Sequence, residues 1–380
     1  MIGPGISGAD RFLGLAVLAA ARRGAGQVDS LAMSPGRRLL DWYDRNRRDL
    51  PWRKSADPYA VWVSEIMLQQ TRVETGRKFY ARFLKRFPNA VALAEAPLAE
   101  VLAAWSGLGY YRRARELHAA ARIVRDRGAL PTTAAELEQL PGVGPYTAAA
   151  IASIAFGEAV PVLDGNVARL LSRWCAEEEP VAKAATRGRL LAIAASLLDR
   201  ARPGDSNQAL MELGATVCLP AAPDCARCPL ASACRAYARG EQRRFPVRAS
   251  RGTTRQVAQV AAVVESAGRL LLFRRADQEA QLAGLWELPL VDATSIRRAS
   301  RELAARYGGE WTIGAAVGRV RHAITTRRFT IVARRATLGG AGNVVAESPV
   351  GAEPGWFARA QASTLALTGA ARKILARLPG

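Results

Sequence analysis

Four closely spaced cysteines constrain this chain more than any other feature of its sequence. They follow the pattern Cys218-x6-Cys225-x2-Cys228-x5-Cys234, and the chain has five cysteines in all, the fifth being Cys175. Without a secretory context, four thiols this close together predict a metal site rather than disulfide bonds. The spacing is compatible with a tetrahedral zinc ion and with an iron–sulfur cluster, and the residues alone leave both open. We expect Cys175 to be an ordinary buried side chain.

A glycine turn occupies the start of segment 140–150, which reads Leu-Pro-Gly-Val-Gly-Pro-Tyr-Thr followed by three alanines. Gly142 and Gly144 flank one apolar residue, and the turn leads into an apolar helix whose first backbone N–H groups can face a phosphate. The pattern is the signature of a helix-hairpin-helix motif. The alternative is a plain glycine turn between two core helices.

Asp164 lies in the turn Asp-Gly-Asn, just before the apolar-periodic stretch 167–174. We expect this stretch to be helical and Asp164 to lie at its N-terminus, where the helix dipole keeps a carboxylate ionised. A capping role alone is the alternative.

Glu65 is placed among apolar residues in a predicted helix over 58–71. One interpretation is structural, with the carboxylate paired to an arginine. The other is functional, since desolvation would raise the pKa of Glu65 and let it donate a proton near neutrality.

An aromatic, glycine-containing loop with two arginines at its end covers residues 105–113. Its apolar and aromatic side chains are suited to wedging into a base stack while its arginines hold phosphates. The alternative is a surface helix cap with core tyrosines.

The charge of the chain favours a polyanionic partner. Its 54 Lys and Arg residues against 33 Asp and Glu give a formal net charge of +21. Nucleic acid is the leading candidate, and an arginine-rich composition without a binding role is the alternative. At 380 residues the chain is long enough for two or three domains.

Residues 1–33 contain an apolar run at 12–21 that is too short to span a bilayer. We considered a signal peptide, but the arginine pair after the run and the nucleic-acid features downstream argue against one. We therefore expect Met33 to be the true start and the preceding residues to be a disordered or spurious extension.

The pattern of the chain changes after an Arg-, Gly-, Ser- and Thr-rich segment at 241–256, which we interpret as a linker. Period-two stretches then predict an α+β domain, with strands at 257–264, 269–273 and 329–334 and a helix at 294–307. No cluster of glutamates suited to Mg²⁺ appears in it, so we do not expect nucleotide hydrolysis.

From about residue 34 to residue 247 the sequence resembles the A/G-specific adenine DNA glycosylases, the MutY family of the endonuclease III-like helix-hairpin-helix superfamily. The resemblance is carried by the four cysteines and by the following motifs: Leu50-Pro-Trp-Arg53, Val63-Ser-Glu-Ile-Met-Leu-Gln-Gln-Thr71, Trp105-Ser-Gly-Leu-Gly-Tyr-Tyr111, Leu140-Pro-Gly-Val-Gly144, Leu163-Asp-Gly-Asn-Val167 and Asn207-Gln-Ala-Leu-Met-Glu-Leu-Gly214.

The resemblance implies a multidomain fold. It comprises an all-α helix-hairpin-helix glycosylase region at 34–240 and a C-terminal α+β Nudix-like domain at 257–380. Within the first region it implies a six-helix barrel at about 58–160 beside a [4Fe-4S] module built from 34–57 and 161–240. It therefore favours an iron–sulfur cluster over zinc, held by the four cysteines in a structural and DNA-positioning role.

The resemblance also implies roles for single residues. Glu65 matches the general acid that protonates adenine, Asp164 matches the carboxylate that stabilises the oxocarbenium-like sugar, and Tyr146 and Asn166 assist there. The implied substrate contacts are Arg53 and Gln208 at the adenine, Gly142 and Gly144 in the hairpin, and Gln70, Thr71, Leu108 and Tyr110 beside the opposing base. The target adenine must leave the stack to reach these groups.

Tyr146 stands where related enzymes that also cut the strand have a lysine nucleophile. The prediction is therefore a monofunctional glycosylase of base excision repair, acting on adenine opposite 8-oxoguanine or guanine. The alternatives are a bifunctional endonuclease III-like lyase and a non-catalytic iron–sulfur DNA-binding protein. We expect a monomer in the bacterial cytoplasm that binds double-stranded DNA and no membrane.

The C-terminal part resembles the Nudix-like domain that reads 8-oxoguanine in this family, but one loop departs from it. The family pattern His-x-Phe-Ser-His is replaced here by His322-Ala-Ile-Thr-Thr, so that Ile324, Thr325 and Thr326 stand at the base-reading positions. The second histidine donor is missing. We expect discrimination between 8-oxoguanine and guanine to be weaker or built differently.

Overall fold

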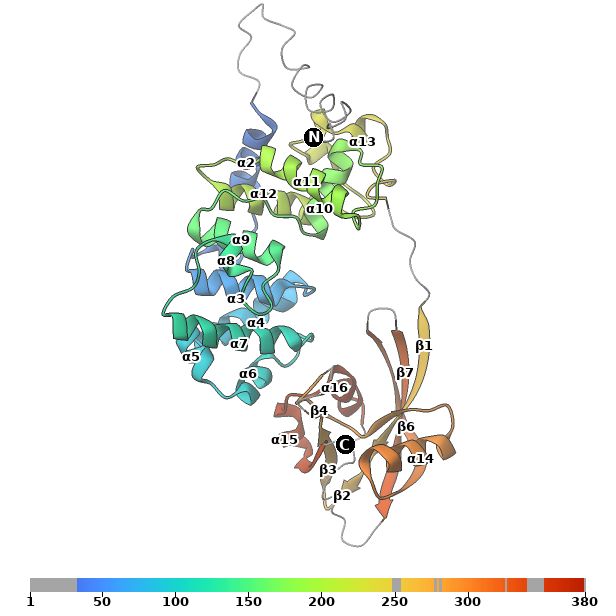
Figure 1. Ribbon diagram of the computed structural model, residues 1–380. Helices are drawn as coiled ribbons and strands as arrows, with labels where there is room; N and C mark the ends of the chain where they lie inside the picture. The colour runs from blue at the N-terminus through green and yellow to red at the C-terminus, as the bar shows by residue number, and fades with distance from the viewer. Residues whose placement is uncertain are drawn as a thin grey trace, which may run out of the picture.

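The computed structural model describes residues 33–247, 254–276, 279, 282–324, 327–339 and 352–378. Within these ranges, the chain is helical up to residue 238 and mixes strands with helices from residue 255 onward (Figure 1). The predicted extension before Met33, with its apolar run, and two of the predicted base-reading residues, Thr325 and Thr326, lie outside the described residues. None of the helices in the described part of the chain is both long and apolar enough to cross a lipid bilayer.

The helical region is built from α-helices with short 3-10 turns between some of them. The elements are α2 (Pro35–Asn46), η1 (Pro51–Arg53), α3 (Pro58–Leu68), α4 (Val73–Arg86), α5 (Ala90–Glu95), α6 (Leu98–Trp105), α7 (Arg112–Arg127), α8 (Ala134–Leu137), α9 (Pro145–Phe156), α10 (Gly165–Cys175), α11 (Ala184–Ser196), α12 (Pro203–Thr216), η2 (Cys225–Arg227), η3 (Ala231–Ala233) and α13 (Arg235–Ala238).

Helix α3 is buried on nearly all sides. The Asp57 side chain caps it by accepting a hydrogen bond from Tyr59 N at 3.0 Å, and Pro58 occupies its first position. It ends at Leu68 rather than at the predicted Thr71. The reason is local, because Gln70 has φ of 54°, in the left-handed region that an α-helix cannot continue through.

Two apolar cores support the helical region. The first is formed by α3 to α9 and includes Trp62, Phe83 and Trp105, and the second joins α2 to α10, α11 and α12. Helix α9 belongs to both, since Ile151 packs into the first core and Ala150 into the second. The helix that follows the glycine turn therefore separates the two cores and contacts each.

Segment 58–160 is fully described and contains seven helices, one more than the six of the predicted barrel. The shortest is α8, with four residues, and α5 also forms less than two full turns. Leu50 and Trp52, which lie in the part assigned to the iron–sulfur module, pack into the barrel core. Helix α2 packs on α12, so the segments on either side of the barrel do associate.

The described residues from 254 to 378 form one mixed and one antiparallel sheet and three helices. The elements are β1 (Arg255–Val263), β2 (Glu265–Ser266), β3 (Arg269–Arg274), β4 (Trp286–Glu287), β5 (Leu290–Asp292), α14 (Ile296–Tyr307), β6 (Glu310–Ile324), β7 (Arg327–Gly339), β8 (Glu353–Ala358), α15 (Arg359–Thr364) and α16 (Gly369–Leu375).

The first sheet has the order β5-β1-β7-β6, with β1 and β7 parallel and β6 and β7 antiparallel. In the second, β3 pairs with β2, β4 and β8. One apolar core lies under α14 and contains Leu303 and Tyr307, and the other lies under α16 and contains Ile331 and Ile374. The helices therefore cover opposite faces of the first sheet.

Five strands of the described residues were missed from the sequence, namely β2, β4, β5, β6 and β8. The first three have only two or three residues each. Strand β6 contains glycines and arginines instead of alternating apolar residues, and β8 contains Pro354 and Gly355, which disfavour a strand. The predicted linker is also too long. Phe245 is 2% exposed and its carbonyl accepts a hydrogen bond from Arg173, so residues 241–247 pack on the helical region, and β1 already begins at Arg255.

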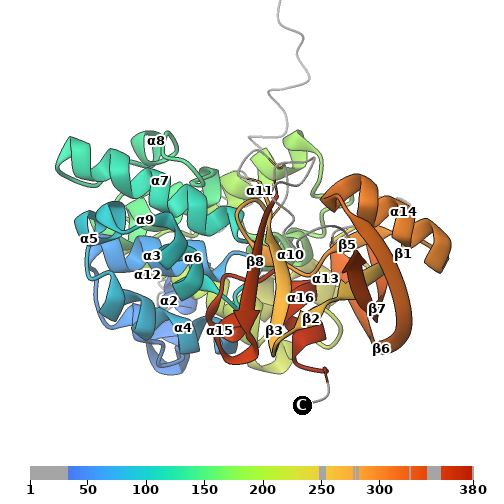
Figure 2. The same ribbon diagram turned by 90° about the horizontal axis from the view of Figure 1, so that it is seen from below.

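The two regions touch at α6 and α7. In Figures 1 and 2, α6 lies close to α15, and the Tyr111 hydroxyl donates a hydrogen bond to the Leu367 carbonyl at 2.9 Å.

Candidate active site and cysteine centre

A pocket of about 480 Å³ opens where the two helical cores meet. Helix α3 contributes to it from the first core, α10 and α12 contribute from the second, and α9 lies between them. The pocket brings together eight residues predicted from the sequence, namely Arg53, Glu65, Gln70, Thr71, Tyr146, Asp164, Asn166 and Gln208. Residues from distant parts of the chain thus share one cavity.

Glu65 lies in this pocket at 8% exposure. The pKa of its carboxyl is raised to about 7, chiefly by burial and in part by the nearby Asp164, while the Tyr146 hydrogen bond and Arg53 oppose the shift. The Tyr146 hydroxyl lies 3.1 Å from Glu65 Oε2. Glu65 is therefore a carboxylic acid that can hold its proton near neutral pH.

Asp164 is the N-cap of α10, as predicted. Its Oδ1 accepts hydrogen bonds from the backbone N–H groups of Asn166, at 2.9 Å, and Val167, at 2.7 Å. Its Oδ2 accepts from the Asn166 side-chain amide at 3.0 Å. Three N–H donors at a helix N-terminus stabilise the negative charge of this carboxylate. The pocket therefore surrounds the Glu65 carboxyl with groups that favour its neutral form, and it surrounds the Asp164 carboxyl with donors that stabilise a negative charge.

Glu212 is a pocket residue that our sequence analysis missed. It is 1% exposed on α12, and it accepts hydrogen bonds from Arg48 at 2.7 and 2.8 Å and from Arg53 at 2.8 Å. Although burial opposes ionisation, the Arg48 and Arg53 hydrogen bonds lower the pKa of Glu212 to about 2. The signal that could have found it is the one that singled out Glu65, a carboxylate inside an apolar helix.

Arg113 is one of the two arginines at the end of the aromatic loop that we expected to hold phosphates, but it is 7% exposed and faces the interior of the helical region. Its guanidinium is buried and donates hydrogen bonds to the carbonyls of Met67 and Gln69 at the end of α3, to the Thr71 hydroxyl at 3.1 Å and to the Gly109 carbonyl at 3.2 Å. It thereby joins the turn after α3 to the aromatic loop.

In the aromatic loop the side chain of Tyr110 is exposed and that of Leu108 is buried. Tyr110 is 57% exposed with φ of 47°, and the Arg113 guanidinium carbon lies 5.4 Å from the centre of its ring. Leu108, which we expected beside the opposing base, is 6% exposed and packs in the first helical core. In this structure Tyr110 is the accessible side chain of the pair.

The glycine turn has the conformation that its sequence predicts. Gly142 has φ of 77°, and a Cβ there would come within 2.7 Å of the Glu116 Cβ. Gly144 is the N-cap of α9, and no atom lies within 4 Å of where its Cβ would be. The N-terminus of α9 is thus open on this side, as an anion site at a helix N-terminus requires.

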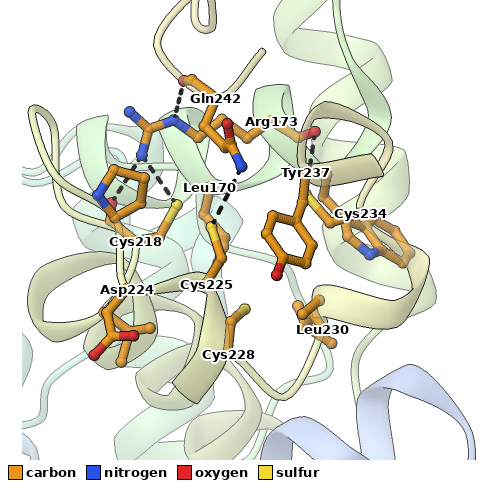
Figure 3. Close-up of a pocket in the computed structure, with 14 residues that line it drawn as sticks. Leu170, Arg173, Cys218, Asp224, Cys225, Cys228, Leu230, Cys234, Tyr237 and Gln242 are labelled. Carbon is orange, nitrogen blue, oxygen red and sulfur yellow. Dashed lines mark hydrogen bonds between the residues drawn. The ribbon is translucent and has the colours of Figure 1, made fainter. Parts of the chain in front are cut away.

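The four cysteine sulfurs line one pocket beside α10 (Figure 3). Arg173, which is 2% exposed, donates a hydrogen bond to Cys218 Sγ at 3.3 Å, and the Gln242 amide donates to Cys225 Sγ at 3.8 Å. Burial raises the pKa of the Cys228 thiol to about 12, so a thiolate there needs a nearby cation. Cys175 does not line this pocket and is half-buried rather than fully buried as predicted.

The four cysteines supply four sulfur donors to one pocket. Among the described residues, no three His, Cys, Asp or Glu side chains are placed to hold a single metal ion. Four thiolates are a donor set that suits either tetrahedral zinc or an iron–sulfur cluster.

In the C-terminal region the predicted base-reading residues are only partly described. Ile324 ends strand β6, where it pairs with Arg327 of β7. Strands β6 and β7 therefore flank residues 325 and 326 in the chain.

Comparison with known proteins matches both regions. A family model described as HhH-GPD superfamily base excision DNA repair protein matches residues 63–193, and a NUDIX domain model matches residues 259–377. A solved structure of a thermostable thymine-DNA glycosylase aligns with a TM-score of 0.50 and 28% identity, covering 54% of this chain and 95% of that one. These matches confirm the predicted helix-hairpin-helix domain followed by a Nudix-like domain.

Full-length relatives carry the name adenine DNA glycosylase. That of Homo sapiens is 42% identical over 308 residues, which is 67% of this chain and 56% of the relative, and that of Arabidopsis thaliana is 42% identical over 294 residues, 67% and 46% of the two chains. The chain thus spans about half the length of these relatives. That of Buchnera aphidicola subsp. Acyrthosiphon pisum is 34% identical, and the match covers 70% of its length. The chain therefore belongs to the adenine DNA glycosylase family.

Proposed function

We propose that this protein is a monofunctional DNA glycosylase that hydrolyses the N-glycosidic bond of adenine mispaired with 8-oxoguanine or guanine in base excision repair. One observation carries the proposal. A carboxyl group whose pKa is raised to about 7, that of Glu65, shares a pocket with the capped carboxylate of Asp164. Cleavage of a glycosidic bond uses one carboxyl group that donates a proton and a second that stays ionised, and Glu65 and Asp164 match these two requirements.

The reaction begins once the target adenosine has left the DNA stack and entered the pocket. Glu65 donates its proton to a ring nitrogen of adenine as the bond between the base and the sugar breaks, so adenine leaves as a neutral molecule. Asp164 stabilises the positive charge that develops on the sugar. Water then adds to the anomeric carbon and returns a proton to Glu65. Tyr146 and Asn166 hold the two carboxyl groups in position through the hydrogen bonds described above.

The adenine contacts that we propose come from η1 and α12. Gln208 has an amide that can both donate to and accept from a base edge, and Arg53 adds donors. Glu212 is held ionised by Arg48 and Arg53, so its carboxylate can accept a hydrogen bond from the exocyclic amino group of adenine. Guanine and thymine carry a carbonyl oxygen where adenine carries this amino group. Glu212 therefore contributes to the selectivity for adenine over these two bases.

A duplex excision assay tests this function. We expect the purified protein to release adenine from 8-oxoguanine:adenine and guanine:adenine pairs and to leave an abasic site that alkali cleaves. No lysine is among the described residues that line the pocket. Borohydride should therefore trap little protein on the DNA, with an endonuclease III-type lyase as the positive control. Trapping as efficient as that of the lyase would refute the monofunctional assignment.

We also propose that the four cysteines hold a [4Fe-4S] cluster with a structural and DNA-positioning role. When bound, the cluster supplies positive charge to the thiolates and cross-links the segment after α12. Cys218, Cys225, Cys228 and Cys234 are the ligands, and Arg173 and Gln242 donate hydrogen bonds to two of their sulfurs.

We expect metal analysis of the protein to find about four iron and four sulfide per chain, with broad visible absorbance. Cys228→Ser should lower the iron content, whereas Cys175→Ser, outside the pocket, should leave it unchanged. A colourless protein that contains zinc would contradict the cluster.

Recognition of the opposite base differs from the family pattern, because Ile324, Thr325 and Thr326 replace Phe, Ser and His. We expect the ratio of single-turnover rates on 8-oxoguanine:adenine and guanine:adenine duplexes to be smaller than for a relative with the histidine. Thr326→His should increase the ratio by restoring a donor. A ratio equal to that of the histidine-bearing relative would show that this loop is not the main reader.

A further inference from the structure

The aromatic loop, residues 105–113, is in contact with the C-terminal domain. The Tyr111 hydroxyl donates to the Leu367 carbonyl at 2.9 Å, and Tyr111 is 4% exposed. This hydrogen bond therefore joins the helical domain to the C-terminal domain in a place shielded from water.

The Leu367 carbonyl is available because of how its neighbours pair with Trp286. Trp286 N donates to the Ala366 carbonyl at 2.9 Å, and Thr368 N donates to the Trp286 carbonyl at 2.9 Å. The carbonyl between these two bonds is the one that reaches Tyr111. The acceptor is thus fixed by the local backbone of the C-terminal domain.

Further contacts reinforce this bond. Arg372, on α16, donates a hydrogen bond to the Ser106 hydroxyl, whose oxygen lies 3.3 Å from the Tyr111 hydroxyl. Leu285, at 0% exposure, and Ala366, at 8%, belong to the same apolar core as the residues of the loop. In Figure 2, α6 lies beside α15, and residues of both helices line one groove.

The backbone of the aromatic loop needs such support. Gly107, Gly109 and Tyr110 all have positive φ, at 112°, 72° and 47°. Tyrosine is uncommon in this region, and such a conformation persists only where its surroundings hold it. Arg113 holds the loop from inside the helical domain, and the C-terminal domain holds it from outside.

We propose that the C-terminal domain, through Leu367 and Arg372, positions the aromatic loop so that Tyr110 is ready to enter the DNA stack. Tyr111 is then a positioning residue. The inference rests on the proposed function for the action of Tyr110 on DNA. It has a specific consequence, because the domain proposed to read the opposite base also sets the conformation of the side chain proposed to open the stack.

Hydrogen exchange in the full chain tests the positioning directly. Arg372→Ala lies in the C-terminal domain, yet we expect amides of residues 105–113 in the helical domain to exchange at least threefold faster. Lys373→Ala is the matched control, since its ammonium donates to the Arg321 carbonyl within the C-terminal domain. That variant should leave the exchange of the loop at the wild-type level.

A second pair of variants changes residues of the helical domain instead of the C-terminal domain. Tyr111→Phe removes one hydroxyl and should produce the same local increase in exchange. Tyr59→Phe removes a similar buried bond, from the Tyr59 hydroxyl to the Phe87 carbonyl at 2.8 Å, that stays inside the helical domain. We expect Tyr59→Phe to leave the exchange of the loop unchanged.

Excision kinetics supply the functional measurement. On an 8-oxoguanine:adenine duplex, Arg372→Ala and Tyr111→Phe should each lower the single-turnover rate three- to tenfold, as expected for loss of one hydrogen bond, while the two controls stay within about twofold of wild type. If the wild-type protein released no adenine, the proposed function would fail, but the exchange comparison would still decide the inference. Exchange of the loop in Arg372→Ala and Tyr111→Phe equal to that in their controls overturns it.

Discussion

Glu65→Gln is expected to lower the single-turnover rate of adenine release by about 10²- to 10⁴-fold, because glutamine cannot donate the proton that adenine needs in order to leave. The substitution keeps the size of the side chain and a group that can hydrogen bond to the Tyr146 hydroxyl. The measurement is excision from an 8-oxoguanine:adenine duplex with enzyme in excess. Glu287→Gln removes another buried carboxyl, in the C-terminal domain, and serves as the control. A Glu65→Gln rate near that of wild type would refute the general-acid role.

The pH dependence of the wild-type rate follows from the same group. Burial raises the pKa of Glu65 to about 7, so the acid is protonated below that pH and loses its proton above it. We expect the rate to be highest below about pH 7 and to fall tenfold per pH unit well above it.

The stability of the protein should respond in the same pH window. A pKa raised from 4.5 to about 7 on folding means that the carboxyl favours the folded state below pH 4.5 and that this contribution is lost as the pH rises to about 7. The difference is on the order of 3 kcal/mol. Since glutamine stays neutral, Glu65→Gln should have a higher thermal unfolding midpoint than wild type at pH 8 and a smaller gain at pH 5. A gain that is the same at both pH values would contradict the titration of a buried Glu65.

Asp164→Asn is expected to lower the rate by about 10²- to 10³-fold while the protein stays folded. Asparagine caps helices about as well as aspartate does, so its side-chain oxygen can still accept the hydrogen bonds from Asn166 N and Val167 N. The variant loses the negative charge that faces the developing sugar cation, and with it the Oδ2 acceptor of the Asn166 side-chain amide. It keeps the two capping hydrogen bonds, so it separates the charge of Asp164 from its capping role.

Asp57→Asn is the control for this substitution. Asp57 caps α3 by accepting a hydrogen bond from Tyr59 N, and it is not among the residues that line the pocket. We expect Asp57→Asn to have near wild-type activity and both variants to have similar thermal midpoints. If Asp164→Asn released adenine as fast as Asp57→Asn, the electrostatic role would be excluded.

The sequence analysis identified residues whose position follows from their neighbours in the chain. Asp164 precedes a helical pattern in a Gly-Asn turn, so its capping position follows from helix geometry alone. The alternatives left open for Glu65 are resolved only by packing, because the sequence cannot show whether an arginine or apolar groups surround it. In the structure burial dominates, and Arg53 opposes it only in part.

Roles that depend on distant contacts escaped the sequence analysis. Arg113 was expected to hold phosphates, but it reaches carbonyls at the end of α3 and in the aromatic loop at once, and no local pattern encodes that. The burial of Leu108 likewise depends on the core that the loop covers. Strands β6 and β8 were missed for a related reason, since pairing with β7 and β3 overrides their weak local preference.

Helix α9 fixes the width of the active site. Its central residues Ala148, Ala149, Ala150 and Ala152 are small, and α3 and α12 pack against it. On the α12 side the approach is so close that a Cβ on Gly204 would lie 2.7 Å from the Ser153 carbonyl oxygen. The alanine-rich helix therefore acts as a spacer of minimal thickness between the helix that carries Glu65 and the core that carries Asp164. A bulkier residue within this spacer would move the two carboxyl groups apart.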